Sequence, residues 1–339
     1  MRNVFFSRNF AYFVYRIPLY RGDVKLKILI NTDITSEQEQ QIESVSDELS
    51  LVKPQNSEEA LREIVDTDIV FGGFNRSLFE NAKQLKWVQV LSAGVDGLLF
   101  PEFAKSDVIL TSAKGFVGPH LADQTWALLL GLLRGLGRSV RERTWDNRMS
   151  IRHATWELSE RTLGIVGLGG TGIDVARRAQ GFDMRIIAVD PEAVEAPSFV
   201  HEVWQMDRFH DLLSESDVVA ICAPLTPETH GMFDDVAFKR MKSHALLINV
   251  TRGKIIDGPA LLRALTSGSI GGAGLDVTPE EPLPDDSPLW DLPNVIVTPH
   301  VAGGSPIRLD RSVGLFCDNL ERLLVGKPLL SVIDKEKGY

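Results

Sequence analysis

Three side chains suited to acid–base and carboxylate chemistry follow short apolar runs in the second half of the sequence. Arg252 comes after "LLINV", Glu281 lies in the loop after "GAGLDV", and His300 comes after "VIVTP". Such runs are typical of buried parallel strands, and open parallel sheets bind ligands at the carboxyl ends of their strands. We therefore expect the three side chains to face a common ligand.

These three side-chain types suit hydride transfer to a 2-oxo acid. Arginine holds a carboxylate through a planar pair of N–H donors, which lysine lacks. The carbonyl oxygen gains a proton as hydride reaches the carbon, and histidine exchanges protons near neutral pH. A glutamate behind the imidazole orients the ring and stabilises its protonated form. Each residue alone is also typical of a structural ion pair, a solvated loop charge or a backbone-bonded histidine, so the prediction depends on their combination.

A glycine-rich turn indicates where a dinucleotide would bind. The segment "GIVGLGGTGIDVARRA" has the spacing G-x-G-x-x-G at Gly167, Gly169 and Gly172, between an expected strand over 163–167 and a helix from about 170. Gly167 permits the tight turn, Gly169 lets the backbone approach the pyrophosphate, and Gly172 lets the helix pack closely on the strand. A tight strand–helix turn without a ligand is the structural alternative.

The residues around this turn predict the identity of the cofactor. The pyrophosphate is expected on the amides around Gly170 and Thr171, because a helix N-terminus favours anions. Asp190 ends the next strand, in "IIAVDP", at about the spacing of 20 residues expected for a ribose ligand. Its carboxylate should accept hydrogen bonds from the adenosine ribose and, with Glu192, repel a 2′-phosphate. The sequence therefore predicts NAD rather than NADP.

The elements that position these residues follow a repeated strand–helix pattern. Five short apolar runs alternate with helical segments up to about residue 116, and a second set of strands begins at about residue 162. This alternation predicts an α/β chain with two doubly wound parallel-sheet domains, Rossmann-like or flavodoxin-like, and a cleft between them. We expect an N-terminal extension over 1–24, a discontinuous substrate domain over 25–116 plus 307–339, and an NAD-binding domain over 117–306.

Composition and charge exclude several classes of protein. The 339 residues are 44% hydrophobic and 24% charged, as in ordinary globular proteins, and carry a net charge of −10. An acidic chain lacks the basic face that nucleic acid requires, and no apolar run approaches the ~20 residues needed to cross a bilayer. The two cysteines have no metal-ligand spacing, so we expect no metal site and a cytoplasmic setting. The apolar helix expected over 119–145 is predicted to form a homodimer surface, with packing inside the chain as the alternative.

Longer stretches of the sequence resemble the D-2-hydroxyacid dehydrogenase family, which includes glyoxylate/hydroxypyruvate reductases and phosphoglycerate dehydrogenases. They are "NVTRGKIIDGPALLRAL", "GGAGLDVTPEEPLPDDSPLWDLPNVIVTPHVAG" and "PLTPETHGMF", and the resemblance extends from about residue 25 to the end. It implies that Arg252, Glu281 and His300 are the catalytic set. Glu281 is chosen over Glu280 because the family's glutamate directly precedes the proline.

The resemblance also implies contacts with the nicotinamide and the substrate. Asp276 in "GLDV" is expected to hold the nicotinamide carboxamide, and Thr251 to border the ring. The glycines after His300, including Gly303, should leave room for both molecules. In "VLSAGVDG" the backbone amides at Ala93 and Gly94 are expected to hold the substrate carboxylate together with the catalytic arginine. A plain strand-ending turn is the alternative at this last segment.

The activity that these features imply is reversible reduction of a small 2-oxo acid by NADH to its D-2-hydroxy acid. Glyoxylate and hydroxypyruvate are favoured, while the substrate side chain and the physiological direction stay open. One alternative is an NAD-sensing protein of the corepressor type, which the acidic composition disfavours. Another is a dehydrogenase that takes hydride from formate or phosphite. Formate enzymes of this superfamily carry glutamine in place of the glutamate, so Glu281 disfavours that alternative.

Overall fold

The computed structural model describes residues 25–339, which form two compact units. The first contains the described residues as far as Ser92, together with Leu98–Ala113 and Leu309–Lys335. The second contains Ala93–Gly97, Lys114–Arg308 and Glu336–Tyr339. Each unit has its own parallel sheet and its own buried core. The extension expected over 1–24 lies outside the described residues.

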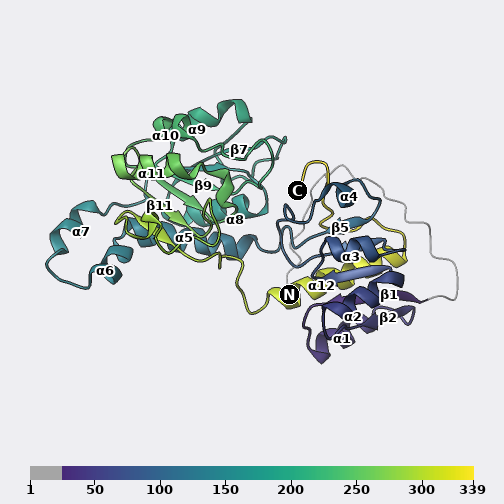
Figure 1. Cartoon of the computed structure of the whole chain (residues 1–339). Helices are drawn as coiled ribbons and strands as arrows, with labels where there is room; N and C mark the ends of the chain where they lie inside the picture. The colour runs from purple at the N-terminus through teal and green to yellow at the C-terminus, as the bar shows by residue number, and fades with distance from the viewer. Residues whose placement is uncertain (1–24) are drawn as a thin grey trace. The chain divides into compact units, whose positions relative to one another are not determined.

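A five-stranded sheet forms the centre of the first unit (Figure 1). Neighbouring strands are all parallel, in the order β2-β1-β3-β4-β5, which is the flavodoxin-like order. The strands coincide with the five expected apolar runs: β1 (Leu26–Asn31), β2 (Leu49–Val52), β3 (Ile69–Gly72), β4 (Trp87–Gln89) and β5 (Ile109–Thr111). The helices of this unit are α1 (Ser36–Glu43), α2 (Ser57–Glu63), the 3-10 turn η1 (Ile64–Asp66), α3 (Arg76–Asn81), α4 (Pro101–Ala104) and α12 (Arg308–Leu324).

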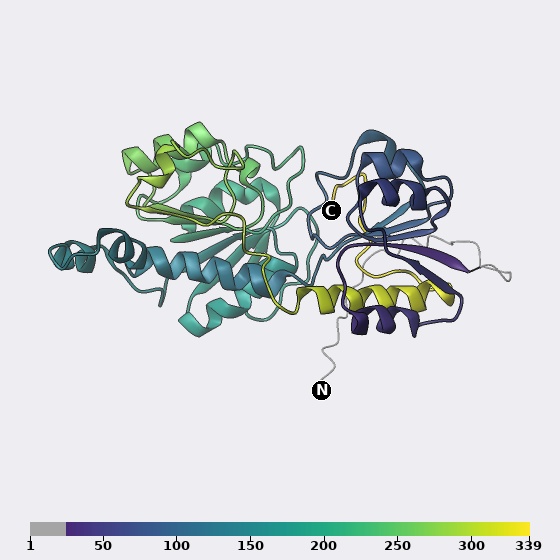
Figure 2. The same cartoon turned by 60° about the horizontal axis from the view of Figure 1, so that its bottom comes forward.

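Helices cover both faces of this sheet, which is why its strands are buried on both sides. Figure 2 shows α1 and α12 together on one face and the helices between residues 57 and 104 on the other. On the first face, Phe316 of α12 stacks on Phe71 with ring centroids 4.5 Å apart and lies 5.1 Å from the ring of Trp87. The helix α12 follows the last strand of the second sheet in sequence yet belongs to this core, so the first unit is discontinuous.

The second unit contains a seven-stranded parallel sheet in the order β12-β11-β10-β9-β6-β7-β8. Six strands coincide with the expected runs: β6 (Thr162–Val166), β7 (Arg185–Val189), β9 (Val218–Ile221), β10 (Leu246–Asn249), β11 (Gly272–Leu275) and β12 (Val295–Val297). The edge strand β8 (Glu202–Trp204) was not expected, because three residues are too few to show a pattern. The chain reverses its direction of strand addition between β6 and β9, which is where doubly wound sheets bind ligands. The two sheets confirm the predicted α/β fold class.

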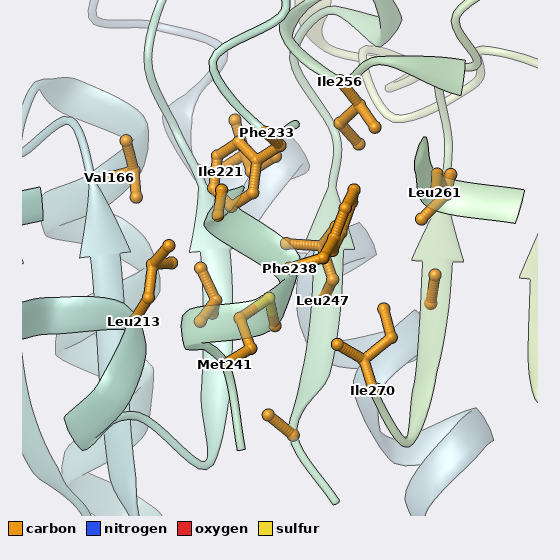
Figure 3. Close-up of a cluster of buried hydrophobic side chains, with 14 of the residues drawn as sticks. Val166, Leu213, Ile221, Phe233, Phe238, Met241, Leu247, Ile256, Leu261 and Ile270 are labelled. Atoms are coloured by element: carbon orange, nitrogen blue, oxygen red, sulfur yellow. The ribbon is translucent and has the colours of Figure 1, made fainter. Parts of the chain in front are cut away.

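The faces of the second sheet carry different sets of helices. On one face β6 and β9 to β11 pack against α9 (Phe209–Glu215), α10 (Asp235–Arg240) and α11 (Gly258–Ser267). Figure 3 shows this core, in which Phe238 and Met241 from the segment of α10 belong to one buried cluster with Ile221 and Leu247 of the strands. The other face packs against α5 (Gly118–Leu133) and α8 (Gly170–Ala179). Short 3-10 turns complete the unit: η2 (Gln180–Phe182), η3 (Met206–Arg208), η4 (Gly253–Ile255) and η5 (Pro288–Trp290).

The helix expected over 119–145 is interrupted, which corrects the prediction. The first helix α5 ends before Gly135, whose φ of +67° lies in the left-handed region that glycine favours, and α6 (Leu136–Glu142) follows. The next helix, α7, covers Arg148–Ala154. The apolar side of α5 is buried within its own unit, as the packing alternative states. Figure 1 shows α6 and α7 extending away from the second sheet. No helix within residues 25–339 is long and apolar enough to cross a membrane.

Candidate active site

The glycine-rich turn connects β6 to α8 and has the geometry that its spacing predicts. Gly167 has a φ of +92°, and a Cβ there would lie 2.8 Å from the Cα of Ala223, so no other residue fits. A Cβ at Gly172 would lie 2.2 Å from the carbonyl oxygen of Gly167. The two glycines therefore bring the helix close to the strand. Both are required by packing alone, whether or not a ligand binds.

Gly169 differs from these two glycines, because a Cβ there would meet no heavy atom within 4 Å. It is the N-cap of α8, and no side chain caps this helix. Uncapped amides in the first turn and the positive end of the helix dipole suit an anion, and the first turn contains Gly170 and Thr171. Packing does not require a glycine at this position, whereas a pyrophosphate against the backbone would. The turn therefore fits the dinucleotide that the sequence predicts.

Asp190 follows β7 and holds the same turn from the side. It is 8% exposed, and its carboxylate accepts hydrogen bonds from the amide of Leu168 at 2.7 Å and from the amide of Glu192 at 2.9 Å. The first bond fixes the position of the acid relative to the glycine turn. Each carboxylate oxygen has a second lone pair, so the group can still accept a hydroxyl donor. Asp190 thus fits a ribose ligand at the edge of the turn.

His300 and Glu281 form a hydrogen-bonded pair at the carboxyl ends of neighbouring strands. The Nδ1 atom of His300, beyond β12, lies 2.9 Å from Oε2 of Glu281, which follows β11. The second carboxylate oxygen, Oε1, accepts a hydrogen bond from the amide of Thr278 at 3.0 Å. Both side chains of the pair are partly exposed, at 51% and 38%. The imidazole is therefore oriented by a fixed carboxylate while it stays accessible to a ligand.

The backbone at His300 is strained. Its φ is +53°, a left-handed conformation that costs free energy in a residue with a Cβ. The amide of His300 donates to the carbonyl of Asp276 at 2.8 Å and to that of Thr298 at 3.0 Å, which holds this conformation. Strained backbone of this kind is concentrated at functional sites, where the surrounding structure compensates for it. The strain favours a functional role for the imidazole.

Asp276 is the main support of the loop that carries this histidine. It is 1% exposed, and its carboxylate accepts hydrogen bonds from the hydroxyl of Thr298 at 2.6 Å and from the amides of Val301 at 3.0 Å and Ala302 at 2.8 Å. Sequence reasoning did not predict this structural role, because the loop and the acid belong to different strands. Its predicted contact with the nicotinamide carboxamide stays a prediction.

Arg252 follows β10, next to β11 in the sheet, so the carboxyl ends of β10, β11 and β12 carry the three predicted catalytic residues side by side. The Nη1 atom of Arg252 donates to the carbonyl of Thr251 at 2.8 Å, and Nε donates to Oδ1 of Asp96 at 2.8 Å. Thr251 itself donates through its amide and hydroxyl to Asn249 at 3.1 and 3.2 Å. Sequence reasoning assigned no role to Asp96 and Asn249, although both lie in the segments "VLSAGVDG" and "NVTRGKIID", because these contacts appear only in the folded chain.

The remaining predicted positions lie on short turns. Ala93 and Gly94 belong to the segment that groups with the second unit, and a Cβ at Gly94 would lie 1.7 Å from Nη2 of Arg252. A Cβ at Gly303 would approach Arg308 to 3.6 Å, an ordinary contact. Half-buried Cys222 follows β9, and desolvation raises the pKa of its thiol to about 12, which makes it a poor nucleophile at neutral pH. Within residues 25–339 no group of three or more His, Cys, Asp or Glu side chains could hold a metal ion.

Comparison with known proteins agrees with this geometry. Residues 126–302 match the model of the "D-isomer specific 2-hydroxyacid dehydrogenase, NAD binding domain". A glyoxylate reductase of Korarchaeum cryptofilum is 36% identical over 264 residues, which are 76% of this chain and 79% of that protein.

Two solved structures extend the similarity to nearly the whole chain. A D-isomer specific 2-hydroxyacid dehydrogenase family protein from Aeromonas salmonicida is 30% identical with a TM-score of 0.76, over 92% of this chain and 99% of its own. An NADPH-dependent glyoxylate/hydroxypyruvate reductase from Sinorhizobium meliloti, in complex with NADP and sulfate, is 27% identical with a TM-score of 0.77, over 93% and 100%. These matches confirm the resemblance found in the sequence. The chain belongs to the D-isomer-specific 2-hydroxyacid dehydrogenase family, whose members are oxidoreductases acting on the CH–OH group of 2-hydroxy acids, and it contains an NAD(P)-binding domain.

Proposed function

We propose that this chain reduces a small 2-oxo acid, with glyoxylate or hydroxypyruvate as the preferred substrate, and that Arg252, Glu281 and His300 are its catalytic set. The observation that carries the proposal is the 2.9 Å pair between Nδ1 of His300 and Oε2 of Glu281, held at strand ends by strained backbone. The names of the glyoxylate reductases among its relatives support this substrate class. We assign cofactor binding to residues 117–306 and substrate binding to 25–116 plus 307–339.

Each residue of the site has a distinct task in this proposal. A bound reduced nicotinamide supplies the hydride. Arg252 and the backbone amides at Ala93 and Gly94 bind the substrate carboxylate and fix the orientation of the carbonyl group. Because Nδ1 of His300 is bonded to Glu281, the proton for the carbonyl oxygen comes from Nε2. In the direction of oxidation the same nitrogen removes the hydroxyl proton. Glu281 keeps the ring oriented and balances its positive charge.

The cofactor contacts follow from the turn and the neighbouring strand ends. The backbone around Gly169, Gly170 and Thr171 would hold the pyrophosphate, and Asp190 would hold the adenosine ribose. Asp276 would hold the nicotinamide carboxamide, Thr251 would border the ring, and Gly303 would leave room beside it.

We propose NAD as the preferred cofactor, because the carboxyl groups of Asp190 and Glu192, just after β7, would repel the 2′-phosphate of NADP. The structural relative from Sinorhizobium meliloti is NADPH-dependent, and a comparison of the two cofactors tests whether this chain differs from it. The ratio of kcat/KM with NADH to that with NADPH should exceed about tenfold, which corresponds to about 1.4 kcal/mol of discrimination. A ratio near one or below it would contradict the assignment.

The reaction is tested by following NADH oxidation with a panel of 2-oxo acids that includes glyoxylate, hydroxypyruvate, pyruvate and a bulky aromatic member. The proposal expects turnover of glyoxylate or hydroxypyruvate with a higher kcat/KM than that of the bulky acid. Tight NADH binding without turnover of any of these acids would refute the enzyme and would favour the NAD-sensing alternative.

We also propose that the chain forms a homodimer through α6, α7 and the loop between them. This segment exposes apolar side chains that monomeric surfaces rarely gather: Leu136 (60%), Val140 (68%), Trp145 (85%) and Met149 (48%). The sequence predicted a dimer surface over 119–145. Because α5 packs inside its own unit, we now place the proposed surface on α6, α7 and the loop between them. Light scattering after size exclusion should give a dimer for the wild type and a monomer for Val140→Asp/Trp145→Asp. A wild-type monomer at micromolar concentration would refute the proposal.

A further inference from the structure

The guanidinium of Arg252 is held by a residue that no catalytic motif includes. Its Nε atom donates to Oδ1 of Asp96 at 2.8 Å, and its Nη1 atom donates to the carbonyl oxygen of Thr251 at 2.8 Å. Among the described residues these are the two hydrogen bonds that the side chain donates. A guanidinium has five N–H groups, so three remain, two of them on Nη2. That number is sufficient for the bidentate grip of a substrate carboxylate.

Gly94 shows where the remaining donors lie. A Cβ at this position would be 1.7 Å from Nη2 and 2.6 Å from Cζ, so the guanidinium lies directly against the backbone of the turn. Asp96 belongs to the same short turn, two residues further along the chain. The turn therefore contacts Arg252 twice, once through the carboxylate at Nε and once through the bare backbone at Nη2. Together the two contacts fix the plane of the group.

We infer that Asp96 is a positioning residue for the substrate carboxylate, and that it acts by holding the guanidinium of Arg252. The inference rests on the proposed function, in which Arg252 binds the carboxylate. Arginine has four rotatable side-chain bonds, and fixing them before the substrate arrives removes an entropy cost from binding. The two side chains are 27% and 36% exposed, so neither is held by burial alone.

The negative charge of Asp96 could also have the opposite effect on substrate binding. A carboxylate beside the binding arginine also repels an anionic substrate, and taken alone this repulsion would weaken binding. If positioning dominates, removal of the side chain raises KM for the 2-oxo acid. If repulsion dominates, removal lowers it. The direction of the change in KM therefore decides between the two effects.

The test compares Asp96→Ala and Asp96→Asn with a matched control, Asp235→Ala. Asp235 also pairs with an arginine on the surface of the second unit, at 2.7 Å from Arg263, but it lies on α10 and outside the site. We expect Asp96→Ala to raise KM for the 2-oxo acid about tenfold with the affinity for NADH unchanged. Asp96→Asn, which keeps an acceptor oxygen for Nε, should recover most of the loss. The control should leave KM unchanged.

A double-mutant cycle shows whether Asp96 acts through Arg252. In an Arg252→Ala background, Asp96→Ala should have no further effect on kcat/KM. An equal effect in both backgrounds would mean a structural role elsewhere and would overturn the inference. So would an unchanged or lowered KM in the single variant.

Direct binding separates this inference from the proposed function. If the wild type reduces no 2-oxo acid, the proposed function has failed. Oxalate offers a carboxylate group like that of a 2-oxo acid. Calorimetric titration of the NADH complex with oxalate then still measures how Asp96 affects carboxylate binding. The inference expects about tenfold weaker oxalate binding in Asp96→Ala, and equal binding would overturn it.

Discussion

Gly169→Ala should weaken cofactor binding without harming the fold. A Cβ at this position meets no heavy atom within 4 Å, and the backbone is extended, with φ −76° and ψ −157°. Loss of glycine entropy in the unfolded chain should even stabilise the protein, by about 0.4–1 kcal/mol. In a domain of 150–250 residues this corresponds to a rise in Tm of roughly 1–4 °C.

The same methyl group projects into the space at the N-terminus of α8 where the pyrophosphate should bind. It would move the anion out of reach of at least one backbone amide. A hydrogen bond to a charged group contributes about 1.5–3 kcal/mol, so the affinity for NADH should fall roughly 10- to 150-fold. Fluorescence titration with NADH measures the affinity, and differential scanning fluorimetry measures Tm.

Two glycines of the same unit serve as controls for Gly169→Ala. A Cβ at Gly172 would lie 2.2 Å from a backbone oxygen, so Gly172→Ala should cost about 1–3 kcal/mol, lower Tm by roughly 2–12 °C, and weaken binding as well. A Cβ at Gly181, outside the turn, also meets nothing, so Gly181→Ala should raise Tm by a similar amount and leave the affinity for NADH unchanged. If Gly169→Ala binds NADH as the wild type does, the pyrophosphate does not rest on this turn and the reasoning is wrong.

Three further predictions concern other groups of the molecule. Asp276→Ala leaves the buried amide of Ala302 and the partly buried amide of Val301 without an acceptor, so it should destabilise the protein by about 2–4 kcal/mol in chemical denaturation and lower kcat, because that loop carries His300. Burial alone would raise the pKa of Asp217, but hydrogen bonds from an amide, a histidine and a lysine outweigh it and lower that pKa. Asp217→Asn should therefore be destabilising at pH 7, and its difference in unfolding free energy from the wild type should shrink as the pH falls below about 4, whereas a pH-independent difference would contradict the pKa. Burial raises the pKa of Cys317 to about 11, and desolvation raises that of Cys222 to about 12, so both thiols should react with a disulfide reagent at pH 8 far more slowly in the native protein than after unfolding.

The sequence was a good guide to the strands and to the glycine turn, because both depend on local patterns. Buried parallel strands appear as short apolar runs, and the spacing of Gly167, Gly169 and Gly172 follows from the geometry of one turn. The edge strand β8 could not be predicted, because three residues are too few to show a pattern of hydrophobicity. The prediction of one helix over 119–145 was wrong, because the backbone at Gly135 is left-handed and separates α5 from α6.

Contacts between distant parts of the chain could not be predicted in the same way. Asp96 and Arg252 are separated by 156 positions, and nothing in "GVDG" indicates that its acid meets a strand-end arginine. The hydrogen bonds of Asp276 to the loop after β12 likewise appear only once β11 and β12 pair. The strain at His300 is a property of the folded loop alone. These contacts depend on sheet pairing, which local sequence does not encode.

The most direct test of the proposed chemistry is the rate of hydroxypyruvate reduction by the wild type and by His300→Asn, with the affinity for NADH measured on both proteins. The proposal predicts a fall in kcat of about 100-fold or more, the usual contribution of a general acid, with NADH affinity unchanged within about twofold. A variant that keeps nearly all of the wild-type kcat would contradict the assignment of His300 as the proton donor.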